Sequence, residues 1–353
     1  MVFPPKKDII GIDIGSSSVK LLELKKAKKG YQLKNVGIAF LPPGTIVDGA
    51  LKDQGAVANI IKNLVSNLGI KTKNVATSLS GHSIIVKNIS LPVMTEKELE
   101  ESIKWEAEQY IPFEIDDVNI DFQILGENPE NKSQMNVLLV AAKQDFINDY
   151  TKVIKEAGLN TVVMDVDFFA LENMFEINYP YNEDEVIALV DIGASILNMD
   201  VLKNGVSVFT RTLSIGGNKI TADIQKKKGI SYEEAEALKI GGQAKGINYN
   251  EIKGIVEDIS LTLATEIQRS LDFFWATFAD EHINKIYLSG GCSKSIELKR
   301  LIEYRVGDIP VEVVNPFAGI DCSEKAFDSE YLEYIAPFMA VGLGLALRRT
   351  GDK

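Results

Sequence analysis

The sequence predicts an α/β protein of two lobes in which one hairpin-centred unit occurs twice. Residues 9–24 (IIGIDIGSSSVKLLEL) read as an apolar strand, a Gly-Ser turn and a second apolar strand. The same pattern returns at 187–203 (IALVDIGASILNMDVLK), and further strands and helices follow each copy. Such a repeat half a chain apart indicates a duplicated core. A length of 353 residues leaves room for two lobes and an insertion.

The first hairpin has the composition of a cradle for phosphate and a divalent cation. Asp13 lies within a strand of β-branched residues, where a carboxylate is costly to bury unless a hydrated cation or another partner faces it. Gly15 permits a sharp turn, and the small Ser16 and Ser17 let backbone N–H groups approach an anion. Lys20 follows on the returning strand. Taken alone, the stretch also fits an ordinary hairpin with Asp13 and Lys20 in solvent.

The second hairpin repeats this arrangement with Asp191 and Gly193. Two hairpins that face each other can hold one polyphosphate from both sides, with the two aspartates around one metal ion. The pair therefore predicts a phosphate and Mg²⁺ site between two lobes.

The segment between the hairpins predicts the rest of the first lobe and an insertion. The first lobe continues with a strand at 36–41, a helix at 56–68 and a strand at 75–79. A compact β-α-β-β-α-β module then covers residues 84–163. Its first helix begins with a capping box of Thr95 and Glu98 and ends before Pro112. A helix at 168–175 leads back to the first lobe.

The second half predicts strands and helices around further glycine turns. The expected elements are a strand at 206–214, a helix after Gly217, a charged, glycine-rich segment at 226–251, a helix at 252–278, a strand at 286–288, a helix at 295–304, a strand at 311–314 and an apolar helix at 334–347. Gly290 and Gly291 follow a strand and precede a helix, where backbone can lie against a flat ligand.

Composition excludes several functional classes. The net charge of −12 and the lack of a basic stripe argue against nucleic acid as the main ligand. Cys292 and Cys322 lack metal-ligand spacing and fit a reducing compartment. The start MVFPPKKD has no apolar signal core, and we expect no membrane-spanning helix. The end ALRRTGDK adds no amphipathic anchor, so we expect attachment to a membrane only through partners.

The ordered set of motifs resembles the actin, Hsp70 and sugar-kinase superfamily, whose fold is a duplicated, ribonuclease H-like, two-lobed α/β fold. The order is phosphate 1 at 9–24, connect 1 at 164–176, phosphate 2 at 187–203, adenosine at 286–294 and connect 2 at 336–348. The inserted module resembles subdomain 1C of the FtsA branch. The segments GIDIGSSSVKLLEL, LPVMTEKELEESIKWEAEQYIPFEIDDVNIDFQIL, LVAAK, RTLSIGGNKIT and AEALK are similar to the PilM family of type IV pilus assembly proteins.

The resemblance implies a division into actin-like subdomains. We expect 1A at 1–83, 1C at 84–163, a return to 1A at 164–184, 2A at 185–218, 2B at 219–283, 2A again at 284–335, and a C-terminal helix of 1A at 336–353.

The resemblance also implies that Mg-ATP or Mg-ADP binds between the lobes. The implied nucleotide contacts are Asp13, Gly15, Ser16, Ser17, Lys20, Asp191, Gly193, Gly216, Gly217, Glu236, Lys239, Gly290, Gly291 and Ser293, with Asp13 and Asp191 holding Mg²⁺ through water. Asp167 lies where relatives carry a water-orienting carboxylate. It is a shorter acid than the Glu of filament-forming relatives, and the second turn is poor in Gly and Thr, so we expect ATPase activity that is weak at most. Glu236 and Lys239 also fit an ordinary charged helix face.

Resemblance to the PilM family implies a cytoplasmic protein at the inner face of the inner membrane that binds the N-terminal cytoplasmic tail of PilN. The implied groove lies between 1A and 1C. Residues 110–113 (YIPF) concentrate apolar side chains where the chain turns, which suggests exposed binding surface; the alternative is that they seal the core of the insertion. Contacts with other pilus platform proteins are implied, and self-association stays open.

Two other functions remain open from the residues. One is an FtsA-like, filament-forming cell-division protein, which usually ends in a basic amphipathic helix after a linker. The other is a small-molecule kinase of the same superfamily, which would need a substrate pocket with a catalytic base between the lobes.

Overall fold

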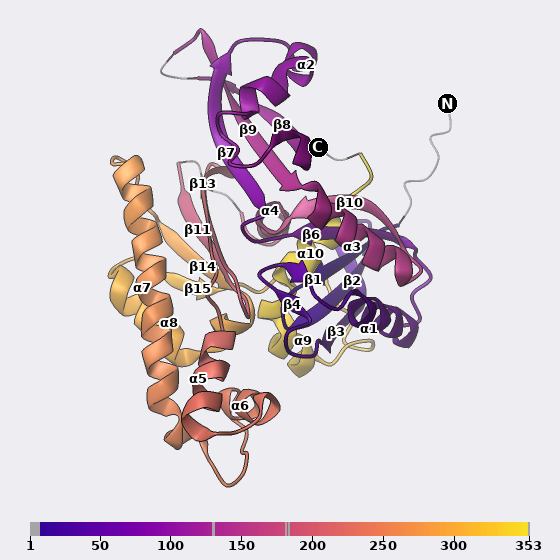
Figure 1. Cartoon of the computed structure of the whole chain (residues 1–353), viewed down its shortest axis with the longest axis vertical. Helices are drawn as coiled ribbons and strands as arrows, with labels where there is room; N and C mark the ends of the chain where they lie inside the picture. Colours follow the sequence, from indigo (N-terminus) through magenta and orange to yellow (C-terminus); the bar gives the residue numbers. More distant parts are fainter. Residues whose placement is uncertain (1–7, 129–130, 181, 183, 352–353) are drawn as a thin grey trace.

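The fold consists of two lobes, each built on one main sheet, with a smaller three-stranded module above the first lobe (Figure 1). The computed structural model describes residues 8–128, 131–180, 182 and 184–351. The first seven residues, which hold most of the N-terminal stretch considered above, lie outside this range.

The first lobe is a six-stranded sheet in the order β10-β6-β1-β2-β3-β16. Its strands are β1 (Ile10–Ile14), β2 (Ser18–Lys26), β3 (Tyr31–Phe40), β6 (Asn74–Leu79), β10 (Asn160–Val166) and β16 (Ile320–Asp321). Side chains alternate between its faces. Ile10, Ile12 and Leu21 pack on α1 (Gln54–Asn67) and α3 (Gln144–Glu156), while Leu22 and Leu24 pack on α4 (Asp167–Asn178) and α10 (Ala340–Leu347). A short β4 (Ile46–Val47) and β5 (Ala50–Leu51) pair separately.

The second lobe repeats the first strand by strand, which confirms the predicted duplication. Its sheet has the order β13-β12-β11-β14-β15. The strands are β11 (Val186–Ile192), β12 (Leu197–Lys203), β13 (Val206–Leu213), β14 (Lys285–Ser289) and β15 (Val311–Val313). In both lobes the hairpin's first strand pairs antiparallel with its second strand and parallel with a later one: β1 with β2 and β6, β11 with β12 and β14.

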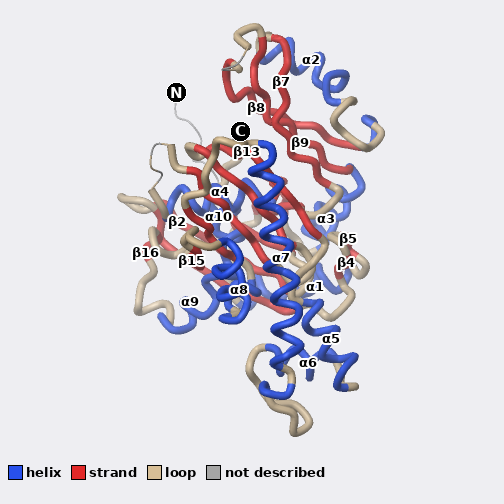
Figure 2. The backbone as a smooth tube through the Cα atoms, turned by 90° about the vertical axis from the view of Figure 1, so that its left-hand side faces the viewer, coloured by secondary structure: helices blue, strands red, loops and turns tan. Residues whose placement is uncertain are grey.

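Helices cover both faces of the second sheet. The long α7 (Lys253–Thr277) and α8 (Ile296–Val306) pack beside each other on the outer face, as Figure 2 shows for α7. The inner face packs against α4 of the first lobe, where the Phe175 ring meets the Tyr287 ring edge-on at 4.7 Å. The short helices α5 (Asn218–Lys228) and α6 (Tyr232–Lys239) extend away at the end opposite the inserted module (Figure 1).

The inserted module is a separate sheet in the order β7-β9-β8 with one helix. It comprises β7 (Ile84–Pro92), α2 (Glu96–Ala107), β8 (Val118–Glu127) and β9 (Gln134–Lys143). The predicted capping box is present: Thr95 Oγ1 accepts from the Glu98 N–H, and the Glu98 carboxylate accepts from the Thr95 N–H at 2.7 Å. Leu99, Ile103 and Ala107 bury the expected stripe of α2.

The elements at residues 144–166, which we placed largely in the insertion, lie in the first lobe. β10 pairs in parallel with β6, α3 packs against α1, and the Tyr150 hydroxyl donates to the Gly49 carbonyl. Parallel strands need a crossover connection between them, usually a helix. Because α3 provides this connection before β10 begins, β10 can pair in parallel with β6. Likewise β16, expected in the second lobe, pairs with β3. We therefore propose that the insertion ends near residue 143.

Residues 110–113 do not form the exposed surface that the sequence suggested. Ile111 is buried in the core of the insertion, and Tyr110 and Phe113 pack partly buried against the same core. The Lys143 ammonium lies 4.4 Å from the centre of the Phe113 ring. The chain turns here with its apolar side chains inward, so these residues seal the insertion, which was the alternative.

The apolar C-terminal stretch is not one straight helix. It divides into α9 (Ser329–Ile335), a 3₁₀ turn at Ala336–Met339 and α10. Pro337 lacks an N–H and its ring clashes with the preceding turn of an α-helix, so the helix cannot run through. Residues 329–347 have the length and composition of a membrane span, which the sequence reading missed, but 72% of that apolar window is buried inside the fold.

A buried pair of carboxyl groups joins the lobes. Glu172 on α4 and Asp200 on β12 hydrogen-bond to each other, and the Ser207 hydroxyl donates to Asp200 at 2.6 Å. Burial raises the pKa of both groups, that of Asp200 to about 6, and the nearby Asp200 charge raises the pKa of Glu172 further. Arg348 lies 3.2 Å from Asp165 in the same region. The contact therefore favours a pair in which Glu172 keeps its proton and donates it in a hydrogen bond to Asp200.

Replacing Glu172 by Gln should make stability less dependent on pH. Since folding raises the pKa of Glu172 and Asp200, the wild type loses stability as pH rises from the unfolded value near 4 through the folded values. A glutamine still donates to Asp200 but has no proton to lose. We expect the free energy of unfolding of the variant, taken relative to that of the wild type, to be on the order of 1 kcal/mol higher at pH 8 than at pH 5 in urea denaturation. The exposed Glu100→Gln on α2, which takes no part in this contact, should show no such gain, and an equal gain there would contradict the assignment.

Candidate functional site

The two hairpin turns have matching backbone geometry. The Gly15 N–H donates to the Ser18 carbonyl at 3.1 Å, and the Gly193 N–H donates to the Ile196 carbonyl at 2.9 Å. Each turn closes a strand whose last residues include the predicted aspartate. The hairpins thus place equivalent turns at the ends of the two sheets.

Asp13 is enclosed rather than solvated. It pairs across the hairpin with Lys20, whose ammonium lies 3.1 Å from Asp13 Oδ2, with the two side chains 12% and 13% exposed. The Lys20 ammonium would also lie 2.8 Å from a Cβ added at Gly15. A lysine held over this turn can meet a phosphate that approaches the same backbone.

Three carboxyl groups converge between the hairpins. The Ser78 hydroxyl donates to Asp167 Oδ1 at 2.6 Å, and the Ser289 hydroxyl donates to Asp191 Oδ1 at 2.8 Å. Burial, followed by the nearby Asp13 charge, raises the pKa of Asp167 to about 8. Burial raises the pKa of Asp191 to about 6, to which the Asp13 charge adds. Buried carboxyl groups whose pKa is raised by a neighbouring carboxylate are a favourable environment for a cation.

A hydrated metal ion fits this group better than a directly coordinated one. Within the part of the chain that the structure describes, no three His, Cys, Asp or Glu side chains lie close enough to hold a metal together. Mg²⁺ usually keeps several waters and takes one or two protein carboxylates, with phosphate oxygens completing its shell. Asp13 and Asp191 suit that role through water.

Four of the predicted glycines lie where a side chain has no room. A Cβ added at Gly216 would lie 2.5 Å from the Gly193 carbonyl oxygen, and one at Gly217 would lie 2.6 Å from Cys292 Sγ. At Gly290, with φ +80°, it would lie 2.5 Å from the Ile192 carbonyl oxygen. At Gly291 it would lie 2.7 Å from the Phe338 ring. These glycines bring the turns after β11, β13 and β14 into contact.

The predicted ribose and adenine contacts form one polar cluster. The Lys239 ammonium lies 2.7 Å from Glu236 Oε2 and 3.0 Å from the Thr221 hydroxyl, and it donates to the Gly217 carbonyl at 3.5 Å. This contact links α6 to the glycine turn. The pair is therefore tied to the Gly217 turn and is not only a charged helix face.

The remaining predicted residues divide into two kinds. Ser16 and Ser17 lie partly exposed in the first turn, where their backbone can meet a ligand. Ser293, however, is buried, and its hydroxyl donates to the Gly290 carbonyl at 2.7 Å. Its side chain supports the turn from inside and does not face a ligand.

Sequence reading missed the groups that hold the carboxyls and turns in place. Ser78, Ser289 and Thr221 donate to or contact predicted residues from segments far apart in the chain. Phe338 covers Gly291 from the C-terminal 3₁₀ turn. Ser78 and Ser289 share one signal, a serine near the end of a strand that enters a glycine turn.

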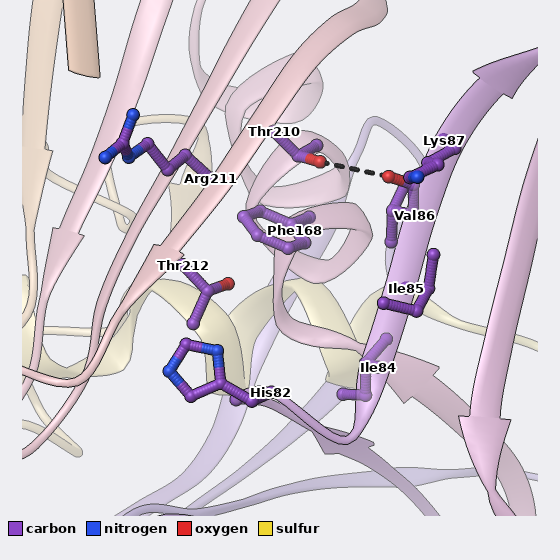
Figure 3. A pocket seen from close by; sticks show the side chains of 10 residues that line it. His82, Ile84, Ile85, Val86, Lys87, Phe168, Thr210, Arg211 and Thr212 are labelled. Carbon is purple, nitrogen blue, oxygen red and sulfur yellow. Dashed lines mark hydrogen bonds between the residues drawn. The ribbon is translucent and has the colours of Figure 1, made fainter. Parts of the chain in front are cut away.

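A second feature is a pocket of about 200 Å³ between the insertion and the second lobe. Figure 3 shows its walls: the edge strand β7 on one side, the edge strand β13 on the other, and Phe168 of α4 between them. The lining residues are Gly81, His82, Ile84, Ile85, Val86, Lys87, Phe168, Thr210, Arg211 and Thr212. The Thr210 hydroxyl donates across to the Val86 carbonyl at 3.4 Å (Figure 3).

A family model described as type IV pilus assembly protein PilM matches residues 11–350. Among solved structures, a PilM–PilN type IV pilus biogenesis complex is similar, with a TM-score of 0.87 and 32% identity over 98% of this chain and 99% of that one. The ethanolamine utilization protein EutJ from Carboxydothermus hydrogenoformans has a TM-score of 0.58 at 17% identity, with 98% and 90% of the two chains covered. MreB5 of Spiroplasma citri bound to AMPPNP has a TM-score of 0.51 at 14% identity, with 97% of this chain and 95% of that chain covered. The last two likenesses show the two-lobed, actin-like fold alone.

Curated relatives include cell division proteins FtsA. That of Streptococcus pneumoniae (strain D39) is 26% identical over 288 residues, 72% of this chain and 61% of its own length. That of Escherichia coli K12 is 23% identical over 256 residues, 67% of this chain and 60% of its own. The chain thus spans about three-fifths of the length of these relatives.

Replacing Gly290 by Ala should destabilise the second lobe. The substitution forces a Cβ against the backbone at Ile192 and strains a positive φ, so we expect a loss of more than 1 kcal/mol. Gly254 is the matched control, since it lies within α7 with open space around its Cβ position. Gly254→Ala should stabilise by up to about 1 kcal/mol. Thermal unfolding of both variants checks this, and equal melting temperatures would refute the close packing.

Proposed function

The chain belongs to the family of the type IV pilus assembly protein PilM, and from this we propose that it is an actin-like, nucleotide-binding adaptor of the pilus assembly platform. The observation that carries the proposal is the convergence of Asp13, Asp167 and Asp191 between two equivalent glycine turns. Such an arrangement suits a Mg-bound polyphosphate and has no evident structural purpose without one.

Each wall of the site supplies one contact that a nucleotide needs. Backbone N–H groups and Lys20 face phosphate at the first hairpin, and the turn at Gly193 faces it from the other lobe. The backbone of the turn at Gly290 and Gly291, fixed by its packing on Ile192 and Phe338, can lie against a flat base, and Glu236 with Lys239 suits the sugar and the edge of the base. A solved neighbour, MreB5, carries AMPPNP, which fits this assignment.

Hydrolysis is expected to be slow. A water-orienting carboxylate must accept a proton or hydrogen bond, but the pKa of Asp167 is raised to about 8. At neutral pH the group is therefore mostly protonated. A bound cation would lower that pKa, yet Asp167 is also held by Ser78, which limits its reach.

The proposed partner is the N-terminal cytoplasmic tail of PilN, and the proposed docking site is the pocket between β7, α4 and β13. A related chain occurs in a PilM–PilN complex. Strands β7 and β13 are edges of their sheets, so an extended peptide can pair with either backbone and insert an apolar side chain beside Phe168. We place the protein at the cytoplasmic face of the inner membrane, held there by this partner.

Removing either aspartate should weaken nucleotide binding that depends on magnesium. Asp13→Ala and Asp191→Ala each delete one of the two carboxylates assigned to the hydrated metal, and calorimetric titration of ATP with and without Mg²⁺ should show a loss of at least about tenfold only with the metal. Asp272→Ala, an exposed acid on α7, is the control. Unchanged affinity in both site variants would rule out the shared site.

Turnover should be far below the enzyme median of about 10 s⁻¹ and should rise with pH. Because deprotonated Asp167 is the active form and a bound cation lowers its pKa from about 8, the wild-type rate should rise with pH and level off below pH 8. Asp167→Asn should leave a low rate with a flat pH profile while binding Mg-ATP. Phosphate release from purified protein measures both, and a rate that falls with pH would contradict the role.

Filling the pocket should block the tail without harming the nucleotide site. Thr210→Phe adds a ring on the β13 wall, and we expect at least a tenfold loss of affinity for a synthetic PilN tail peptide in calorimetry. ATP affinity in the absence of peptide should stay within about twofold. Thr262→Phe on the exposed side of α7 is the matched control. Full peptide affinity in Thr210→Phe would show that the tail binds elsewhere.

A further inference from the structure

The insertion carries more than half of the net negative charge of the molecule. Residues 84–143 contain twelve acidic side chains and five lysines, so this module accounts for −7 of the net charge of −12. It comprises only about a sixth of the chain. A surface of this sign repels the anionic lipids at the cytoplasmic face of a membrane and attracts basic segments of other proteins.

Helix α2 turns part of this charge outward together with a large aromatic ring. Leu99, Ile103 and Ala107 form the buried side of the helix. The opposite side carries an exposed row at helical spacing, which we call the α2 face and which consists of Glu98, Glu101, Trp105 and the C-terminal cap Glu108. The Trp105 side chain is 79% exposed. Because tryptophan is enriched where proteins meet and depleted from open surface, a ring exposed among carboxylates indicates a contact surface.

The α2 face lies beyond the end of the pocket's β7 wall. The pocket lining on β7 ends at Lys87, and the strand continues for five residues to Pro92, which is about 17 Å at ~3.3 Å per residue. The exposed Val93 follows, and Thr95 then caps α2. Figure 1 shows α2 at the end of the module farthest from the first lobe. An extended tail that leaves the pocket along β7 therefore reaches α2 after about five more residues.

The chemistry of the segment that arrives there follows from where the tail comes from. Cytoplasmic residues close to a membrane-spanning helix are enriched in Lys and Arg. Such cations can pair with Glu101 and Glu108 and lie over the Trp105 ring. Once the pocket holds the tail, its basic stretch is present at a high local concentration, so even weak contacts on α2 raise the overall affinity.

Resting on the proposed function, we propose that the α2 face binds the basic, membrane-proximal stretch of the same partner whose tail occupies the pocket. The partner is then held at two points, with an apolar side chain in the pocket and its cations on α2. The two contacts together orient the protein, because α2 is turned toward the membrane from which the tail emerges.

The test compares two synthetic PilN peptides in calorimetry with the full chain. The short peptide contains the N-terminal residues that fill the pocket, and the long peptide contains the whole tail up to the membrane-spanning helix. We expect the long peptide to bind at least about fivefold tighter in low salt. Most of this advantage should vanish at 1 M salt, where the Debye length is about 3 Å, and when the Lys and Arg of the added stretch are replaced by Gln.

The two peptides separate failure of this proposal from failure of the proposed function. Equal affinities of the two peptides in low salt would overturn the second contact and leave the tail pocket standing. No binding of either peptide would overturn both.

The variant Glu101→Gln/Trp105→Ala tests the assigned residues. Both side chains are exposed, so the buried stripe of α2 is unchanged. We expect the affinity for the long peptide to fall to that for the short peptide, while the affinity for the short peptide stays within about twofold of wild type. The matched control Tyr304→Ala/Asp308→Asn removes an exposed ring and an exposed acid at the end of α8 and should keep the full advantage. An advantage that survives in the α2 variant would overturn the assignment.

Discussion

The close approach of α10 to the first sheet is the constraint on which the site depends. A Cβ at Gly11 would lie 2.4 Å from the Gly342 carbonyl oxygen, and one at Gly344 would lie 1.7 Å from that of Ala170. Only glycine permits helix, strand and neighbouring helix to touch by their backbones. Both α4 and β1 therefore pack directly against α10. These two elements carry Asp167 and Asp13, respectively. Their carboxyl groups are thereby held close enough to raise the pKa of Asp167.

The same proximity of buried carboxyl groups lowers the stability of the folded protein. Burial and mutual repulsion raise the pKa values of Asp167 and Asp191, so the folded state is less favourable at neutral pH than it would be with neutral side chains. A cation that binds only the folded state relieves this repulsion and stabilises the fold. Stability and ligand binding are thus linked through the same carboxyl groups. The hydrogen-bonded pair of Glu172 and Asp200 places a second buried acidic contact between the lobes.

The insertion gives an actin-like fold a surface that its two lobes alone lack. Its strand β7 lies opposite the edge strand β13, and Phe168 closes the space between them. An edge strand normally needs protection against unwanted pairing. Here the two edges face each other, and the side chains of Asn88 and Thr210 donate across to carbonyl groups of the opposite strand.

By itself the sequence determined the duplicated hairpins, the aspartates and glycines in their turns, the capping box of α2 and the order of nearly every strand and helix. These features are local: β-branched runs, glycine turns and capping residues act within a few positions of the chain. The boundaries of the inserted subdomain could not be predicted as well. The order of elements β-α-β-β-α-β is the same whether β10 pairs with β7 in the insertion or with β6 in the first lobe. The inward turn at residues 110–113 and the kink at Pro337 inside an apolar run also depend on what packs against them.

Only the tertiary structure decided which side chains share a site. Ser78 meets Asp167 across 89 positions, and Ser289 meets Asp191 across 98. No local pattern encodes such pairs, because they arise when separate strands enter neighbouring positions of a sheet. The pocket is a stronger case, since its walls come from two sheets and have no common sequence signal. The sequence determined the secondary structure and the side-chain chemistry of each segment. The packing of distant segments decided which of these side chains lie together in one site.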